Sequence, residues 1–257
     1  MLTNNLELMK RASREGFAIP AINTQGGNYD IIWACCKAAQ EMRSPIILAH
    51  YVATGAYSGH DWFVQVARWC ANKVDVPVSI HLDHGDSFET CMEMLKLGFT
   101  SLMIDGSTHP IEENAAMTNE VLRVAKCFGV PVEAEIGELL RLDNGVPMEN
   151  KNIVDPDEVR HFLELCRPDT LAIGIGNATA ITGASRRSTW TCWRRCADSP
   201  ISRWCCTAAP AWRRAWCATP FSWGWPRSTS APRSVTNTCS ITRRRWSRWT
   251  TRAIPGS

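Results

Sequence analysis

The chain lacks several features that define common classes of protein. No stretch of about eighteen apolar residues occurs in its 257 residues, so the sequence predicts no membrane span and no membrane partner. The first residues carry no basic segment followed by an apolar run, so we expect no secretory signal and a cytoplasmic location. In that compartment the twelve cysteines are expected to be reduced thiols rather than a disulfide framework.

The last part of the chain lacks whole residue types. Residues 179–257 contain no Leu, Met, Lys, Glu, Gln, Tyr or His, but they hold 14 Arg, one acid (Asp198) and nine of the twelve tryptophans. Their net charge is +13, whereas residues 1–178 have 14 basic and 24 acidic residues and a net charge of −10. Folded domains use Leu, Glu and Lys in their helices, and no apolar period runs through this tail. We therefore expect one domain over 1–178 and no native domain over 179–257.

Nucleic acid binding is the alternative interpretation of the tail, because Arg contacts and Trp stacking both suit single strands. The missing residue types favour the first interpretation, and we expect no specific nucleic acid partner.

Residues 1–178 alternate between short apolar runs and amphipathic stretches of helical length. The predicted strands are 17–23, 44–50, 77–83, 99–105, 130–136 and 170–176. The predicted helices are 29–42, 60–73, 87–97, 110–128 and 156–166. Such alternation is typical of βαβ units and a parallel sheet. No glycine-rich phosphate fingerprint follows the first strand, which favours an α/β fold of the TIM (β/α)8 barrel type, with about six of eight units present.

Polar residues gather at the carboxyl ends of the predicted strands, where barrel enzymes carry their active sites. These residues are Asn23, Asp83, His84, Asp105, Glu135 and Asn177. His81 shares a strand face with Asp83, and Glu133 shares one with Glu135. Buried carboxylates are costly unless they are paired or bind a metal. Asp, His and Glu at neighbouring strand ends therefore predict a divalent metal site.

Simpler roles fit several of these residues equally well. Asn23 also suits the cap of the helix that follows it, and Asp105, which precedes Gly106 and Ser107, also suits a turn. His81 also suits a core position in which its ring nitrogens are satisfied by neighbours.

Four segments together resemble the class II, zinc-dependent fructose- and tagatose-bisphosphate aldolases. The segments are 80–85 with 87–89, 99–105, 132–137 and 171–177, in the family's order and spacing. The resemblance runs from about residue 5 to residue 178. It implies an aldehyde-lyase of carbohydrate metabolism, including glycolysis, that reversibly cleaves a ketose 1,6-bisphosphate into dihydroxyacetone phosphate and an aldehyde. It also implies a phosphorylated sugar substrate and a homo-oligomer for the intact protein.

The resemblance assigns roles to individual residues. His84 matches the first of three histidines that bind zinc, and Asp83 matches the acid/base at the C4 hydroxyl. Asp105 and Glu135 match ligands of a secondary cation site found in part of the family, which leaves open a monovalent cation beside the zinc.

Two regions depart from the family pattern. The family has a Gly-Gly-x-Glu-Asp type of loop after the fifth strand, whereas residues 137–145 read GELLRLDNG. An ungapped comparison places Asp143 at the position of the base that exchanges a proton of the dihydroxyacetone phosphate half. After the second strand, the family often has Gly or a small hydroxyl residue near the phosphate, and Tyr51 stands there in this chain. These departures leave open a sister aldolase for another phosphorylated keto-sugar, and we expect Asn23 to bind the substrate.

A shift of reading frame near codon 178 would explain the tail. The family continues with Ala-His-Gly, whose His binds zinc, whereas residues 178–180 read Ala-Thr-Ala. If the third base of each codon is read together with the first two bases of the next codon, the new codons at these places can encode His and Gly. In the same frame 199–211 can encode the seventh strand with its zinc histidine, and 221–232 can encode the eighth strand and phosphate loop. The alternative function is therefore that of an inactive, frameshifted aldolase product.

Overall fold

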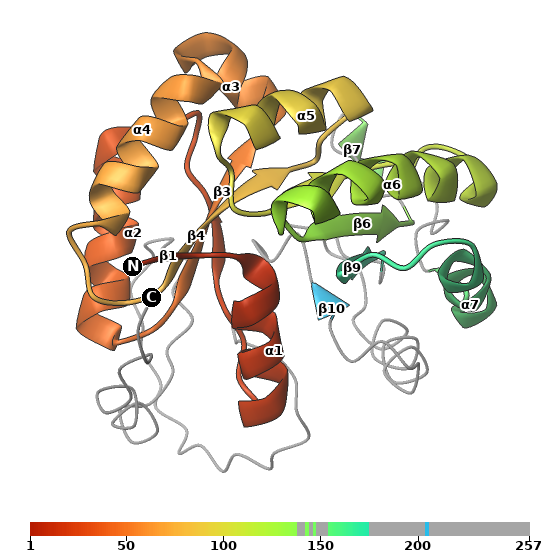
Figure 1. Cartoon of the computed structure of the whole chain (residues 1–257), viewed down its shortest axis with the longest axis horizontal. Coiled ribbons are helices and arrows are strands. Elements are labelled where there is room, and N and C mark those ends of the chain that lie inside the picture. Colours follow the sequence, from red (N-terminus) through yellow and green to blue (C-terminus); the bar gives the residue numbers. More distant parts are fainter. Residues whose placement is uncertain (138–141, 144–145, 148–153, 175–203, 206–257) are drawn as a thin grey trace.

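A computed structural model describes residues 1–137, 142–143, 146–147, 154–174 and 204–205 (Figure 1). The strands are β1 (Leu2–Thr3), β2 (Ala21–Asn23), β3 (Ile46–Tyr51), β4 (Val78–Asp83), β5 (Leu102–Ile104), β6 (Val132–Ile136), β7 (Leu142–Asp143), β8 (Val146–Pro147), β9 (Thr170–Ile173) and β10 (Trp204–Cys205). The helices are α1 (Asn5–Glu15), α2 (Tyr29–Met42), α3 (Val52–Ser58), α4 (His60–Ala71), α5 (Phe88–Leu97), α6 (Ile111–Ala125), the 3-10 helix η1 (Lys126–Phe128) and α7 (Pro156–Leu165). Within these residues no helix is long and apolar enough to cross a membrane.

Parallel pairing joins most of the strands in chain order, except that β1 pairs parallel with the start of β4. β2 pairs with β3 and β3 with β4, while β5 pairs with β6 and β6 with β9. Two bridges, His81 to Ser101 and Gly85 to Ile104, connect β4 to β5. Successive parallel strands with a helix between them are the arrangement of a TIM-type barrel, as predicted. β7 and β8 pair antiparallel as a separate small ribbon.

Prolines set where four of the strands begin. Pro20, Pro45, Pro77 and Pro131 directly precede β2, β3, β4 and β6. Each strand therefore starts later than the apolar run that predicted it, because proline has no N–H to donate to the ladder. A proline carbonyl group can still accept a hydrogen bond of the ladder, since the Ile47 N–H donates to the Pro20 oxygen at 3.0 Å.

The predicted helices are confirmed to within a few residues. α2 spans 29–42 as predicted, because Asn28 caps its start by accepting from the Ile31 N–H at 3.1 Å. α7 begins with a capping box between Asp155 and Glu158, with Pro156 in its first turn. The stretch predicted as one helix over 110–128 is α6 followed by η1.

Six elements were not predicted as such: α1, α3, β1, β7, β8 and β10. α3 contains Gly55 and has no side-chain cap at its start, so it shows little local helix signal. β10 pairs parallel with β9, and it is the part of residues 179–257 that the structure describes. The rest of that tail, including the predicted domain boundary near 178, lies outside the described residues, and so does Asn177.

The two faces of β4 show how the strands divide apolar from polar side chains. Val78, Ile80 and Leu82 are fully buried in the apolar core, which also contains Phe63 of α4 and Met94 of α5. The alternate residues of β4, 79, 81 and 83, face the other way. In Figure 1 the helices that follow the strands, α2 to α7, lie along the outer side of the sheet, so this polar face points away from them.

Candidate metal centre

Three side chains converge at the carboxyl ends of β4, β5 and β6. His84 follows β4, Asp105 follows β5, and Glu135 lies in β6. The Nδ1 atom of His84 lies 2.6 Å from Oδ2 of Asp105 and 3.5 Å from Oε2 of Glu135. One ligand atom from each residue lies within 4.8 Å of the other two. The structure thus brings together three residues that are up to 51 positions apart in the sequence.

Local backbone geometry directs His84 toward Asp105. His84 has φ +52°, a left-handed conformation that turns the chain sharply after β4. Gly85 follows, and its N–H donates to the Met103 oxygen at 3.1 Å while its own oxygen accepts from the Asp105 N–H at 2.8 Å. A Cβ at Gly85 would meet the Met103 oxygen and the Leu82 side chain, so this close approach requires glycine.

The charges of the cluster are strongly coupled. Burial opposes protonation of His84, but the hydrogen bond to Asp105 and the nearby carboxylates outweigh it and raise the pKa of His84 to about 9. Burial alone would raise the pKa of Asp105, but the bonds from His84 and Ser107 dominate and hold it below its usual value. His84 and Asp105 therefore form an ion pair at neutral pH. Burial and the charge of Asp105 raise the pKa of Glu135 to about 8.

This donor set fits a divalent cation. Among the described residues, the buried Oε2 atom of Glu135 has no hydrogen-bond partner, which is costly for a carboxylate at 2% exposure. An imidazole and two carboxylates are ligands that zinc and similar divalent metals accept in proteins. A cation held between them would satisfy the Glu135 oxygen and displace protons from the cluster.

Asp83 and Asn23 lie beside the cluster. Asp83 ends β4, and the Asn23 side-chain amide donates to its Oδ2 atom at 3.5 Å. Burial raises the pKa of Asp83, although His84 and Asn23 favour its charged form. The suggestion that Asn23 caps the next helix is wrong, because Asn28 occupies that position. The turn role suggested for Asp105 is confirmed together with its contact to His84, because its Oδ1 atom accepts from the Ser107 N–H at 3.0 Å.

A second layer of polar side chains lies two residues further from the carboxyl ends of the same strands. His81 shares a hydrogen bond of 3.1 Å between its Nδ1 atom and the Ser101 hydroxyl, and its Nε2 atom is 3.9 Å from Oε2 of Glu133. The Thr170 hydroxyl donates to the same Glu133 oxygen at 3.2 Å. Burial, together with the charge on His84, lowers the pKa of His81 to about 3, so this ring is neutral. His81 is therefore a core histidine with a bonded ring nitrogen.

Sequence reasoning missed the pair formed by His50 and His60. His50 is fully buried in β3, stacks on Phe63 and lies 2.8 Å from Nδ1 of His60 through its Nε2 atom. A polar residue inside the apolar run 44–50 was the signal that could have found it. Asp143 lies in β7 opposite Val146, but its side chain and the rest of its loop lie outside the described residues.

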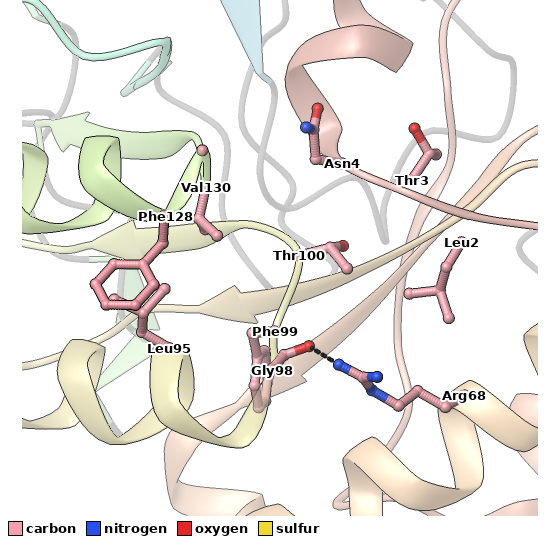
Figure 2. Close-up of a pocket in the computed structure, with 11 residues that line it drawn as sticks. Leu2, Thr3, Asn4, Arg68, Leu95, Gly98, Phe99, Thr100, Phe128 and Val130 are labelled. Atoms are coloured by element: carbon pink, nitrogen blue, oxygen red, sulfur yellow. Dashed lines mark hydrogen bonds between the residues drawn. The ribbon is translucent and has the colours of Figure 1, made fainter. Parts of the chain in front are cut away.

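A shallow hollow at the opposite, amino end of the strands carries no comparable chemistry (Figure 2). It has a volume of about 400 Å³, and Thr100 and Val130 on its wall precede β5 and β6. Arg68 is the only charged residue among those that line it, and its guanidinium donates to the Gly98 oxygen at 2.8 Å.

The chain is similar to known aldolases over most of its described length. The family profile described as fructose-bisphosphate aldolase class-II matches residues 3–190. A fructose-bisphosphate aldolase of Thermus caldophilus is 38% identical over 180 residues, which cover 69% of this chain and 58% of that protein. The D-tagatose-1,6-bisphosphate aldolase subunit GatY of Klebsiella oxytoca is 33% identical over 185 residues, covering 71% of this chain and 64% of that one.

Solved structures agree with the sequence relatives. The crystal structure of the YdjI aldolase from Escherichia coli K12 has a TM-score of 0.65 and 28% identity, covering 77% of this chain and 69% of that one. A putative fructose-1,6-biphosphate aldolase from Coccidioides immitis has a TM-score of 0.62 and 26% identity, covering 76% and 69%. The chain spans about 58% of the length of the first curated relatives that it matches. The match over 3–190 and the parallel α/β fold together show that the chain belongs to the class II fructose-bisphosphate aldolase family.

Proposed function

We propose that the site at the carboxyl ends of β4, β5 and β6 performs metal-dependent aldol chemistry. The reaction is the reversible cleavage of a ketose 1,6-bisphosphate, of fructose or tagatose type, into dihydroxyacetone phosphate and an aldehyde. The convergence of His84, Asp105 and Glu135 next to Asp83 is the observation that carries this proposal. The same proposal includes a cytoplasmic location, a role in glycolysis and assembly into a homo-oligomer.

The metal proposed for the site is zinc, with His84, Asp105 and Glu135 as its ligands from the described residues. When bound, it would supply a Lewis acid for the ketose carbonyl and for the enediolate that develops as the carbon–carbon bond breaks. In the arrangement that the family resemblance implies, Asp105 and Glu135 would instead hold a second, monovalent cation, and His84 would remain with the zinc.

The protein's own residues divide the proton transfers. Asp83 takes the proton of the C4 hydroxyl as the bond between C3 and C4 breaks, and it returns that proton in the condensation direction. Burial raises the pKa of Asp83, which suits a group that must both accept and release a proton. The amide of Asn23 orients the Asp83 carboxylate and binds the substrate. Asp143 is proposed to exchange the proton at C3 of dihydroxyacetone phosphate.

Cleavage assays with the zinc-loaded chain test this function. We expect release of dihydroxyacetone phosphate from fructose or tagatose 1,6-bisphosphate, and loss of that activity after treatment with a chelator. Asp83→Asn should lower kcat by about 10² to 10⁴ without lowering the zinc content. Asp86→Asn is the matched control, because Asp86 is exposed and bonds to Ser87 and Thr90. Equal activity of the two variants would contradict the role of Asp83.

We also propose that residues after about 178 are read in a shifted frame. The composition break supports this proposal, and so does β10, which pairs with β9 within the segment 199–211 that can encode the family's seventh strand. In the other frame these codons can encode the two further histidines that the family resemblance assigns to zinc. An inactive, frameshifted product is the alternative function, and the similarity to aldolases does not favour it over the function proposed above.

Sequencing the DNA across codons 170–185 tests the frame directly. A missing base that restores Ala-His-Gly would support the proposal, and the repaired protein should bind zinc and cleave the substrate with higher activity. A gene that reads as printed, with relatives sharing the same tail, would contradict it.

A further inference from the structure

An aromatic ring stands beside the metal-site histidine, at the mouth of the site. Tyr51 is the last residue of β3, and the strand register pairs it with Asp83, the last residue of β4. Its ring meets the His84 ring edge to face, with 6.0 Å between centroids and an angle of 86°. The five residues before it in β3 are buried, whereas Tyr51 is 39% exposed. The ring therefore has one side against the site and another open to solvent.

Contacts on both sides hold the backbone of Tyr51 in place. Its carbonyl oxygen accepts a hydrogen bond of 2.7 Å from the Thr54 hydroxyl, and α3 begins at the next residue. The preceding residue, His50, is clamped between Phe63 and His60, with 4.2 Å between the His50 and Phe63 ring centroids. The backbone at Tyr51 is thus held by the protein itself, and the contact with the His84 ring places the Tyr51 ring as a wall of the site.

Such a wall can act on a ligand in two ways. The face of the ring offers apolar area that a carbon chain would cover, and the phenol hydroxyl can donate or accept one hydrogen bond. A branched or bulky substituent at the same place would collide with the ring. Both effects act near Asp83, because Tyr51 and Asp83 are paired in the register of β3 and β4.

From this geometry we propose that Tyr51 determines which aldehyde half the enzyme accepts. It favours a short, unbranched aldehyde that carries a polar group within reach of the phenol hydroxyl. The inference rests on the proposed function, since that function assigns Asp83 to the C4 hydroxyl, where the aldehyde half of the sugar begins.

Three variants of the full chain test this role: Tyr51→Ser, Tyr51→Phe and Tyr57→Ser. Tyr57 is the matched control, because it lies on α3 and is 98% exposed. Each zinc-loaded protein is first given dihydroxyacetone phosphate alone in D2O, and loss of the C3 proton signal reports the half-reaction. Condensation with glyceraldehyde 3-phosphate and with a branched aldehyde then gives kcat/KM for each partner. Thermal melts followed by circular dichroism show that the variants are folded.

We expect all proteins to exchange the C3 proton at similar rates. Tyr51→Ser should shift the ratio of kcat/KM toward the branched aldehyde by about 10- to 100-fold, whereas Tyr57→Ser should leave it unchanged. Tyr51→Phe should keep the exclusion of the branched aldehyde and weaken only the use of the polar one.

Three other results would overturn the inference, each in a different way. Normal proton exchange with an unchanged aldehyde ratio in Tyr51→Ser removes the role of Tyr51 and leaves the proposed function standing. Loss of proton exchange in Tyr51→Ser shows that the ring acts on the metal site through His84 rather than on the aldehyde. Absence of exchange in the unsubstituted chain overturns the proposed function, and this inference with it.

Discussion

The imidazole of His84 and the carboxylate of Asp105 are joined by a hydrogen bond of 2.6 Å between Nδ1 and Oδ2. The two residues are 21 positions apart and follow consecutive strands. The bridge between Gly85 and Ile104 brings these strand ends together. A charge-assisted bond at this distance couples the protonation of the two groups.

Replacing Asp105 should change how the metal-free protein titrates. In Asp105→Asn the pKa of His84 should fall from about 9 toward its ordinary value near 6.5, because the strongest favourable partner of the imidazolium is removed. A raised histidine pKa stabilises the fold below pH 6.5, and this stability is lost as the pH rises through about 9. The variant should therefore show a flatter dependence of unfolding free energy on pH in that window. NMR titration of the imidazole signals measures the shift, and an unchanged His84 pKa would contradict the ion pair.

Metal affinity should distinguish the two carboxylates of β6. Glu135→Gln should weaken zinc binding by about 10- to 100-fold or more, because it replaces a charged ligand of the cluster by a neutral amide. Glu133→Gln is the matched control, since Glu133 lies on the same strand face but bonds to Thr170. Competition with a chromogenic chelator gives both affinities. Equal losses in the two variants would place the cation elsewhere.

The buried pair of His50 and His60 should make the fold sensitive to acid. Burial, aided by His60, lowers the pKa of His50 to about 4, so the unfolded chain binds a proton more readily than the native one between about pH 4 and 6.5. Stability from this group is complete above pH 6.5 and is lost as the pH falls through that window, by at most about 1.4 kcal/mol per pH unit. His50→Phe keeps the stack on Phe63 and should reduce this slope. Urea melts at several pH values measure it, and an unchanged slope would contradict the assignment.

A glycine inside α3 should resist replacement by alanine. Alanine in place of a helical glycine usually stabilises a helix by about 1 kcal/mol. At Gly55, however, a Cβ would meet the imidazoles of both His50 and His60, so Gly55→Ala should destabilise the protein by about 1 to 3 kcal/mol. The double variant Gly55→Ala, His60→Ala should recover part of this loss, because it removes one of the two obstructing rings. Denaturant midpoints for the single and double variants test the argument.

Local signals in the sequence accounted for the order and bounds of most elements. The apolar period and the caps Asn28 and Asp155 define α2 and α7, and a proline marks the start of each of four strands. These signals act over a few residues, so they could be found without any knowledge of contacts. α3 was not predicted, because Gly55 weakens its local helix signal. Packing against β3 and α4 stabilises this helix instead.

The sequence by itself determined that polar groups would stand at the carboxyl ends of parallel strands, because alternation and strand order are local properties. Only the tertiary structure decided which of them meet. His84 reaches Asp105 and Glu135 because it adopts a left-handed φ and Gly85 allows a close approach of β4 and β5. Tyr51 lies beside His84 because parallel register places it opposite Asp83. Distances between residues far apart in the chain depend on strand pairing and buried contacts, which no local pattern of the sequence contains.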